Sequence, residues 1–183
     1  MKARNLLITL STTLMVLFAS YGYASVGSST AEWKYWRTVG QAQLSVLFFD
    51  IYQSRLLTPT GVYEQTDDIT PHPLALSIHY QRDISRSQLI DATEEQWEKL
   101  GYSQSRRKQW LFQLEGIFPD IKKGQRLAYV TDGQTGHFYY QDSGGVEQIG
   151  VIEDESLNDA FLAIWLSPQT QYPKLRDQLI GEK

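Results

Sequence analysis

The chain has 183 residues, with 17 Lys and Arg against 21 Asp and Glu, and it contains no cysteine. The absence of cysteine excludes disulfides, a thiolate nucleophile, a lipoprotein anchor and any cysteine-ligated metal site. The formal net charge of −4 argues against nucleic acid and anionic membrane as partners, because both favour a basic surface.

The N-terminus has the pattern of an export signal. Lys2 and Arg4 precede an apolar run over residues 6–19, and Gly22-Tyr23-Ala24 supplies the small residues of a cleavage site. We predict a cleaved signal peptide over 1–24 and a periplasmic protein; the alternative is an uncleaved anchor, although the run is shorter than the ~20 residues of a spanning helix. Cleavage would leave 15 of the 17 basic residues against 21 acidic ones, a net charge near −6.

No other segment is long and apolar enough to span a bilayer, so we expect no stable membrane insertion after signal cleavage. Residues 25–32 are small and polar and predict a flexible spacer, and residues 33–183 fit one domain with a sizeable core.

The first part of the domain reads as strands. Residues 33–57 are rich in aromatic and β-branched side chains, with a bend or bulge expected at 39–42. Residues 44–52 carry large apolar side chains on both faces, which predicts a central strand. A turn at 58–61 and a polar loop precede a further strand, 74–81.

Two helices and a meander follow. Ser85 or Ser87 is predicted to cap a helix that ends at Gly101, and a second helix is predicted over 105–116. Three strands joined by short Gly-containing turns are then predicted at 125–131, 136–141 and 147–152.

The C-terminal stretch predicts a helical pair. Apolar residues at helical spacing end at Ser167-Pro168, and a second short helix begins near Pro173. Strands, a helical pair, a meander and another helical pair together indicate an α+β domain with helices on one face of an antiparallel sheet.

Several landmarks, in their order, resemble the chalcone isomerase superfamily, and in particular its bacterial exported members. They are Phe49 to Leu56, Trp97 to Gly101, Phe118-Pro119 followed by Gly124 and Gly136-His137-Phe138, and Ile149 to Leu166. The resemblance spans roughly residues 33–179. It implies an open-faced sandwich, in which a large antiparallel β-sheet lies under a layer of α-helices.

The resemblance also implies where a reaction would take place. The family's ring closure depends on an arginine, a threonine and a tyrosine in the cleft between sheet and helices. Here the threonine position falls at Leu47, the tyrosine at Ser85 and a helical asparagine at Ala92, and the arginine falls near Tyr35. A shift of two residues would place Arg37 there. We therefore expect the chain to lack most of the catalytic set.

The fatty-acid-binding branch of the superfamily needs less, namely an arginine and a tyrosine that hold a carboxylate. Arg82 and Tyr80 have the spacing of one strand face and could form such a pair. Alternatively, Arg82 pairs with Asp83 or a helix carboxylate, and Arg37 is an exposed residue stacked on Trp33. The candidate ligand-binding residues are Arg37, Tyr52, Tyr80, Arg82, Trp97 and Trp165.

Other chemistry has little support. His72, His79 and His137 show no metal-ligand spacing, and there is no phosphate loop, dinucleotide fingerprint or Gly-x-Ser-x-Gly motif. We expect no metal and no cofactor. The leading hypothesis is a non-catalytic module that binds a small apolar or amphiphilic ligand such as a fatty acid. The alternatives are an intramolecular lyase or isomerase acting on a chalcone-like or enone substrate, and a structural envelope partner with a filled interior.

Overall fold

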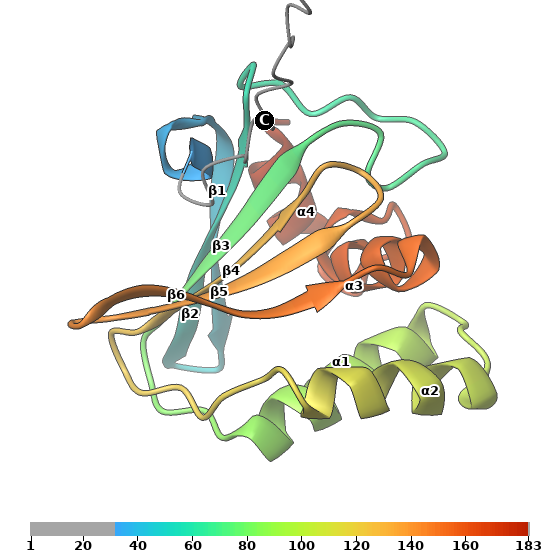
Figure 1. Ribbon diagram of the computed structural model, residues 1–183. Coiled ribbons are helices and arrows are strands. Elements are labelled where there is room, and N and C mark those ends of the chain that lie inside the picture. The colour runs from blue at the N-terminus through green and yellow to red at the C-terminus, as the bar shows by residue number, and fades with distance from the viewer. Residues whose placement is uncertain (1–31, 183) are drawn as a thin grey trace, which may run out of the picture.

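The computed structural model describes residues 32–182, which form one antiparallel sheet with helices packed against one of its faces (Figure 1). The predicted signal peptide and residues 25–31 of the predicted spacer lie outside the described residues; Glu32 already begins the short 3-10 helix η1. The predicted α+β open-faced sandwich is confirmed. Within 32–182, no helix has both the length and the apolar character needed to cross a membrane.

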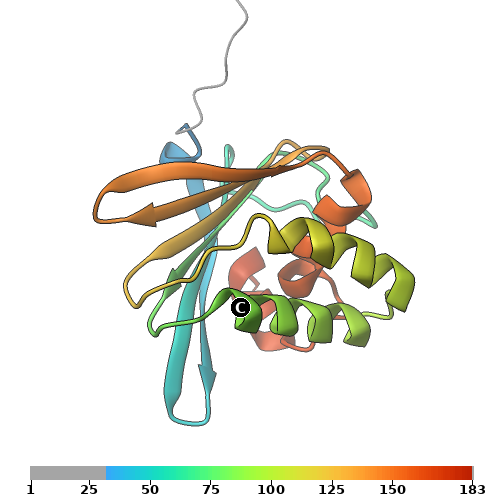
Figure 2. The same cartoon turned by 60° about the horizontal axis from the view of Figure 1, so that its bottom comes forward.

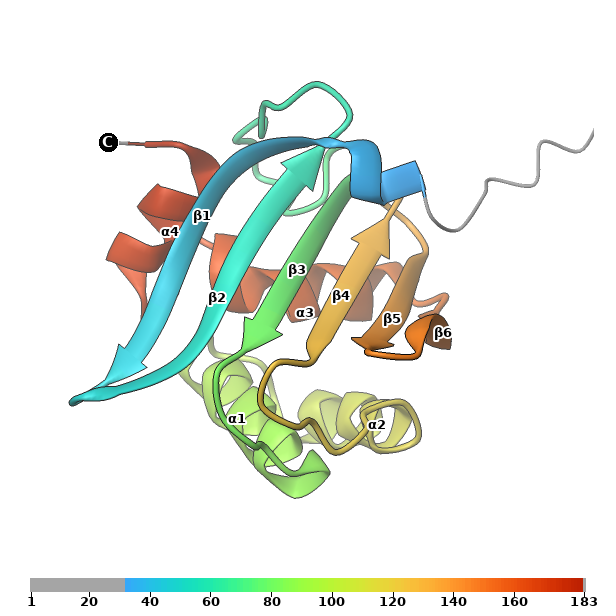
Figure 3. The same cartoon turned by 90° about the vertical axis from the view of Figure 1, so that its left-hand side faces the viewer.

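The six strands lie side by side in chain order, each antiparallel to the next. Their bounds are β1 Arg37–Val46, β2 Phe49–Thr58, β3 Leu74–Tyr80, β4 Arg126–Thr131, β5 Gly136–Asp142 and β6 Gly145–Ile152. The helices are η1 Glu32–Tyr35, α1 Arg86–Lys99, α2 Gln104–Glu115, α3 Glu155–Leu166 and α4 Pro173–Ile180. Figure 3 shows the face without α-helices, with η1 lying at one end of it.

Central strand β3 shows how the sequence pattern positions the core. Leu74, Leu76, Ile78 and Tyr80 recur at every second position, and all four are buried in the main core on the helical side. Ala75 faces the other way, into a smaller cluster around Trp33. The predicted strand is therefore correct in place and in facing.

The predicted central strand over 44–52 is wrong. This segment is the tip of the β1–β2 hairpin: Val46 pairs with Phe49, and Leu47 and Phe48 form the turn between them. Strand β1 is an edge strand, so the large apolar side chains at the tip have no covering layer. The predicted bulge near 39–42 is present as a register shift between Thr38 and Gly40.

Leu47 adopts φ 56°, the left-handed region that Gly or Asn normally occupies in two-residue hairpin turns. For a residue with a Cβ, this conformation costs about 1–2 kcal/mol. Folding alone would therefore favour a smaller residue at the apex of this hairpin.

The helix boundaries follow their predicted signals. The Ser85 side chain accepts from the backbone N–H of Gln88, and the Gln88 side chain accepts from the Ser85 N–H, forming a capping box at α1. Gly101 follows α1 with φ 85°. Helix α3 ends at Leu166, directly before Ser167-Pro168, as predicted.

Candidate functional site

A cavity of about 220 Å³ lies between the sheet and the helices, on the side of the molecule that carries β1–β3 and α1. Most of its walls are apolar. It is lined by Leu44, Ile51, Tyr52, Ile78 and Tyr80 on the first three strands, Ile84 in the loop before α1, Gln88, Leu89, Ala92, Thr93, Glu95 and Gln96 on α1, and Phe118, Leu127, Phe161, Ile164, Trp165 and Tyr172.

The sequence of α1 explains why space remains there. Where α1 borders the cavity it carries short or polar side chains, the buried Thr93 and Gln96 and, at the open side, Ala92, where a tightly packed helix would carry large apolar ones. The next inward residue, Trp97, is fully buried and donates from Nε1 to the Ala160 carbonyl of α3 at 2.7 Å. Helix α1 is thus fastened to α3 at one end while its middle leaves a gap over the sheet.

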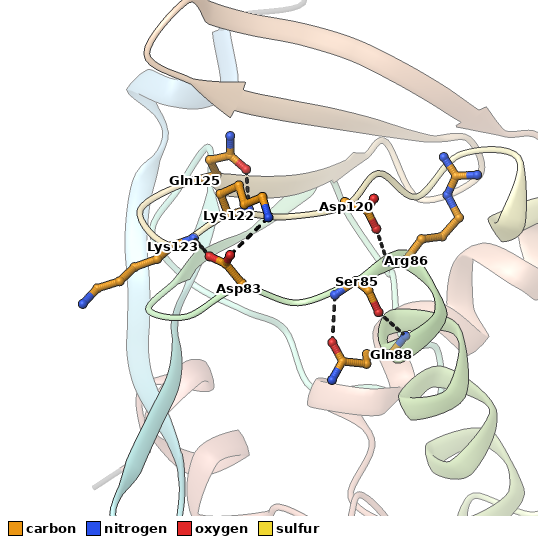
Figure 4. A network of polar contacts seen from close by, with 8 residues as sticks. All are labelled: Asp83, Ser85, Arg86, Gln88, Asp120, Lys122, Lys123 and Gln125. Carbon is orange, nitrogen blue, oxygen red and sulfur yellow. Dashed lines mark hydrogen bonds and ion pairs between the residues drawn. The ribbon is translucent and has the colours of Figure 1, made fainter.

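The other end of α1 is held by a polar network (Figure 4). The Arg86 N–H donates to Asp120 at 2.8 Å and the Lys123 N–H donates to Asp83 at 2.9 Å, and Ile84 forms a β-bridge with Ile121. These contacts join the loop before α1 to the loop before β4. Because Ile84, Gln88 and Phe118 also line the cavity, the network positions that end of its wall.

Two phenols supply polar groups within the apolar walls. Tyr52 Oη accepts a hydrogen bond from Trp165 Nε1 at 2.9 Å, and the Tyr52 and Tyr80 rings meet edge to face with centroids 6.0 Å apart. Burial raises the pKa of both hydroxyls well above the ordinary tyrosine range. Both phenols are therefore neutral at physiological pH and act as hydrogen-bonding groups.

Tyr80 is the more available of the two. Its side chain is 5% exposed, and no residue in the described range 32–182 forms a hydrogen bond with its hydroxyl. The hydroxyl oxygen is not among the fully buried polar atoms that lack a partner in this part of the chain. It is therefore open to the cavity, where it can donate to or accept from a ligand hydroxyl or carbonyl. Gln96 brings a second neutral polar group, a buried side-chain amide, to the same space.

Formal charge is almost absent from the cavity. Among the described residues that line it there is no Lys, Arg or His, and Glu95 is the one carboxylate. Glu95 is exposed and forms an ion pair with Lys99 one helical turn away. Together with exposed Ala92 and Gln88, Glu95 marks the open side of the cavity.

The structure divides the six candidate residues. Tyr52, Tyr80 and Trp165 meet on the cavity. Trp97 lies behind its wall, packed edge to face on Trp110 with ring centroids 5.3 Å apart.

The two arginines are elsewhere. Arg37 is exposed at the start of β1, opposite Thr58, with its stem beside Gly61. Arg82 is exposed just beyond the end of β3 and shares a surface hollow with Phe48 and Lys123. Neither lines the cavity that Tyr52 and Tyr80 share, so the arginine and the tyrosine of the expected carboxylate-binding pair do not converge there.

The contacts of Asp83 also differ from the pairing with Arg82 that the sequence allowed as an alternative. Asp83 forms an ion pair with Lys122 at 3.2 Å and accepts from the backbone N–H of Lys123. No ion pair joins it to Arg82 among the described residues. These contacts lower the pKa of Asp83, with the Lys123 backbone hydrogen bond as the largest cause.

The positions implied by the family resemblance fall in three different settings. Leu47 is at the exposed hairpin tip, Ser85 is the N-cap of α1, and Ala92 lines the cavity. Only Ala92 is at the cavity, and it has no polar group. Gln96, which brings an amide there, was not predicted. It lies in the predicted helix one turn after Ala92, and this i, i+4 spacing was the available signal.

Within residues 32–182, no three His, Asp or Glu side chains gather closely enough to hold a metal ion. His72 serves the loop before β3, where its Nε2 accepts from the Glu64 N–H at 3.0 Å. The three histidines thus show no common site in the part of the chain that the structure describes.

The fold and the cavity define a class of protein: an α+β open-faced sandwich with a small apolar cavity under its helical layer. A family model described as chalcone isomerase-like matches residues 39–181. The chain belongs to this family. It is also 28% identical to an uncharacterized protein of Haemophilus influenzae over 157 residues, which is 84% of this chain and 72% of the relative.

Proposed function

We propose that this chain binds a small, largely apolar ligand with one uncharged polar group and does not transform it. The observation that carries this proposal is a mostly apolar cavity onto which the Tyr80 hydroxyl opens without a hydrogen-bond partner among the described residues. A volume of about 220 Å³ is below the roughly 300–1,000 Å³ of pockets for drug-sized ligands. One short acyl chain, or a compound with one or two rings, matches that space.

The charge of the walls restricts the polar group. A buried carboxylate needs a cation or several N–H donors. The described lining residues include no cation, and their polar groups apart from Glu95 are neutral: the hydroxyls of Tyr52, Tyr80, Thr93 and Tyr172, the amides of Gln88 and Gln96, and the Trp165 indole N–H. A fatty acid therefore fits with its carboxyl protonated or placed at the open side beside Gln88. A fatty alcohol, aldehyde or ester fits with its oxygen at Tyr80.

Calorimetric titration of the purified chain with decanol and with decanoate tests this proposal. Ala92→Trp should block the open side and abolish binding, whereas Asp91→Trp, on the neighbouring exposed position outside the cavity, should leave it unchanged. Tyr80→Phe should weaken decanol binding about tenfold, the value of one hydrogen bond. Absence of binding by either ligand, and of any co-extracted lipid from the host, would sink the proposal.

We also propose that the chain is exported to the periplasm after cleavage of residues 1–24. The basic start, the apolar run and Gly22-Tyr23-Ala24 support this. N-terminal sequencing of the protein from the periplasmic fraction checks it, and a chain that still begins at Met1 would contradict it.

An intramolecular lyase or isomerase is the second candidate, because the chain belongs to the chalcone isomerase-like family and has three phenols, those of Tyr52, Tyr80 and Tyr172, on the cavity. A reaction through an enolate requires stabilisation of a developing negative charge. Here Tyr52 and Tyr80 could donate to it, without a cation nearby. Turnover of a chalcone that is lost in Tyr80→Phe would favour this function over simple binding.

A further inference from the structure

The tip of the β1–β2 hairpin is a cluster of exposed apolar side chains on a surface that is otherwise mostly polar. Leu47 is 85% exposed, Phe48 is 98% exposed and Phe49 is 64% exposed, and Val46 beside them is 51% exposed. Figure 2 shows the hairpin extending beyond the helices at one end of the molecule. These four residues, 46–49, are called the hairpin tip below.

Cations lie next to the hairpin tip. Phe48 and Phe49 share a hollow with Arg82 and Lys123, and Asp50 in the same hollow accepts a hydrogen bond from Ser45. In Figure 4 the Lys123 side chain extends away from the loop, while its backbone N–H holds Asp83. Arg82, Lys122 and Lys123 thus oppose two carboxylates, and the tip region is net positive in a chain of net charge −4.

The hairpin tip is also continuous with the cavity. Leu44 and Ile51 lie two residues inside the tip on each strand, and both line the cavity wall. A molecule at the tip is therefore next to one side of that cavity. The β1–β2 hairpin thus supplies both the tip and part of the cavity wall.

We propose that the hairpin tip docks on the surface of a phospholipid bilayer. Leu47 and Phe48 enter the boundary between headgroups and acyl chains, and Arg82 and Lys123 contact lipid phosphates. Apolar side chains at an apex with cations behind them match this boundary, which is apolar on one side and anionic on the other. The net negative charge of the chain counts against an anionic membrane as a partner for its surface as a whole, and the same charge orients the net positive tip toward the bilayer. Binding to the membrane is reversible, because one short hairpin does not cross the bilayer.

The absence of cysteine in the chain permits a direct test of contact. Phe48→Cys and, as the matched control, Phe112→Cys are each labelled with an environment-sensitive fluorophore and mixed with phosphatidylethanolamine–phosphatidylglycerol vesicles. Phe112 is 79% exposed on α2, away from the tip. We expect a blue shift at position 48 and none at position 112; equal responses at the two positions would overturn the proposal.

Vesicle co-sedimentation measures the strength of docking. Leu47→Gly with Phe48→Ser should lower the partition coefficient roughly 100-fold, while Phe112→Ser should leave it unchanged; Leu47→Gly suits the left-handed turn, so this variant should fold. The double variant Arg82→Gln with Lys123→Gln should lower the partition coefficient about tenfold at low salt. The control variant Lys108→Gln should leave the partition coefficient unchanged.

Other occupants of the tip give different results. If the tip joins two copies of the chain, ultracentrifugation shows a dimer that Leu47→Gly with Phe48→Ser dissociates, and the membrane proposal fails. Absence of vesicle binding by the unmodified chain also overturns it. All these measurements use protein without added ligand, so they succeed or fail independently of the proposed binding function.

Discussion

Trp97 was a candidate ligand-binding residue, and the structure places it behind the cavity wall as the anchor of α1. Trp97→Phe removes the 2.7 Å hydrogen bond to the Ala160 carbonyl, which contributes about 1 kcal/mol. It also leaves a void where the larger ring packed on Trp110, which costs about 1–2 kcal/mol. We therefore expect a loss of about 2–3 kcal/mol in the free energy of unfolding, and about 3–5 kcal/mol for Trp97→Ala.

Equilibrium unfolding in urea measures this loss as a lower midpoint at an unchanged m-value. Because Trp97 does not line the cavity, the affinity of Trp97→Phe for decanol should stay within about threefold of the unmodified chain, a change of less than 1 kcal/mol. Trp165→Phe is the matched control: it lines the cavity and loses the bond to Tyr52, so binding should weaken. The reasoning is refuted if Trp97→Phe keeps its stability and loses ligand affinity more than tenfold.

Three further changes test packing and polar contacts in other parts of the fold. Gly40→Ala should destabilise the chain by about 3 kcal/mol or more in thermal unfolding, because a Cβ there would lie 2.0 Å from a main-chain carbonyl of α4; a neutral result would mean that α4 moves freely on β1. Asn158→Leu leaves the buried Tyr129 hydroxyl without its 2.8 Å acceptor, so it should lower the free energy of unfolding by about 3 kcal/mol. The loss should be smaller in a Tyr129→Phe background, and additive losses in a double-mutant cycle would contradict this coupling. The backbone N–H of Thr135 is the largest cause of a lowered pKa at Asp132. The carboxylate therefore stabilises the fold above the ordinary pKa of 3.8, and this stabilisation is lost as the pH falls through the lower folded-state pKa. Plotted against pH, the free energies of unfolding of the unmodified chain and of Asp132→Asn should converge below pH 3.8, and parallel curves would refute the assignment.

Local signals in the sequence were sufficient for most of the elements. The alternation of Leu74, Leu76, Ile78 and Tyr80 located β3 and its buried face, because side chains on a strand point to opposite sides in turn. The predicted choice of Ser85 or Ser87 marked the start of α1 for an equally local reason. The structure shows that Ser85 is the cap, since its hydroxyl accepts from a backbone N–H three residues on.

The hairpin turn could not be found in the same way. Leu47 and Phe48 carry none of the Gly, Asn or Pro signals of a turn, and the run of large apolar residues around them is typical of a covered strand. Pairing of β1 with β2 along their whole length sets the turn there. That pairing joins residues up to 21 apart, such as Arg37 and Thr58, and no short sequence window contains it.

The candidate site shows the same division. The sequence by itself determined which neutral aromatic groups were present, and it placed Tyr80 on the strand face that Leu74, Leu76 and Ile78 share. The inner position of Tyr52 depends on the pairing of β2 with β3, where Tyr52 lies opposite Tyr80. Only the tertiary structure decided that Trp165 joins them, that Trp97 is behind the wall, and that Arg82 lies beyond the end of β3, where strand alternation no longer applies. The cavity itself results from how α1 is held at its two ends above the sheet. Its size and polarity depend on contacts between segments far apart in the chain, which residue patterns do not record.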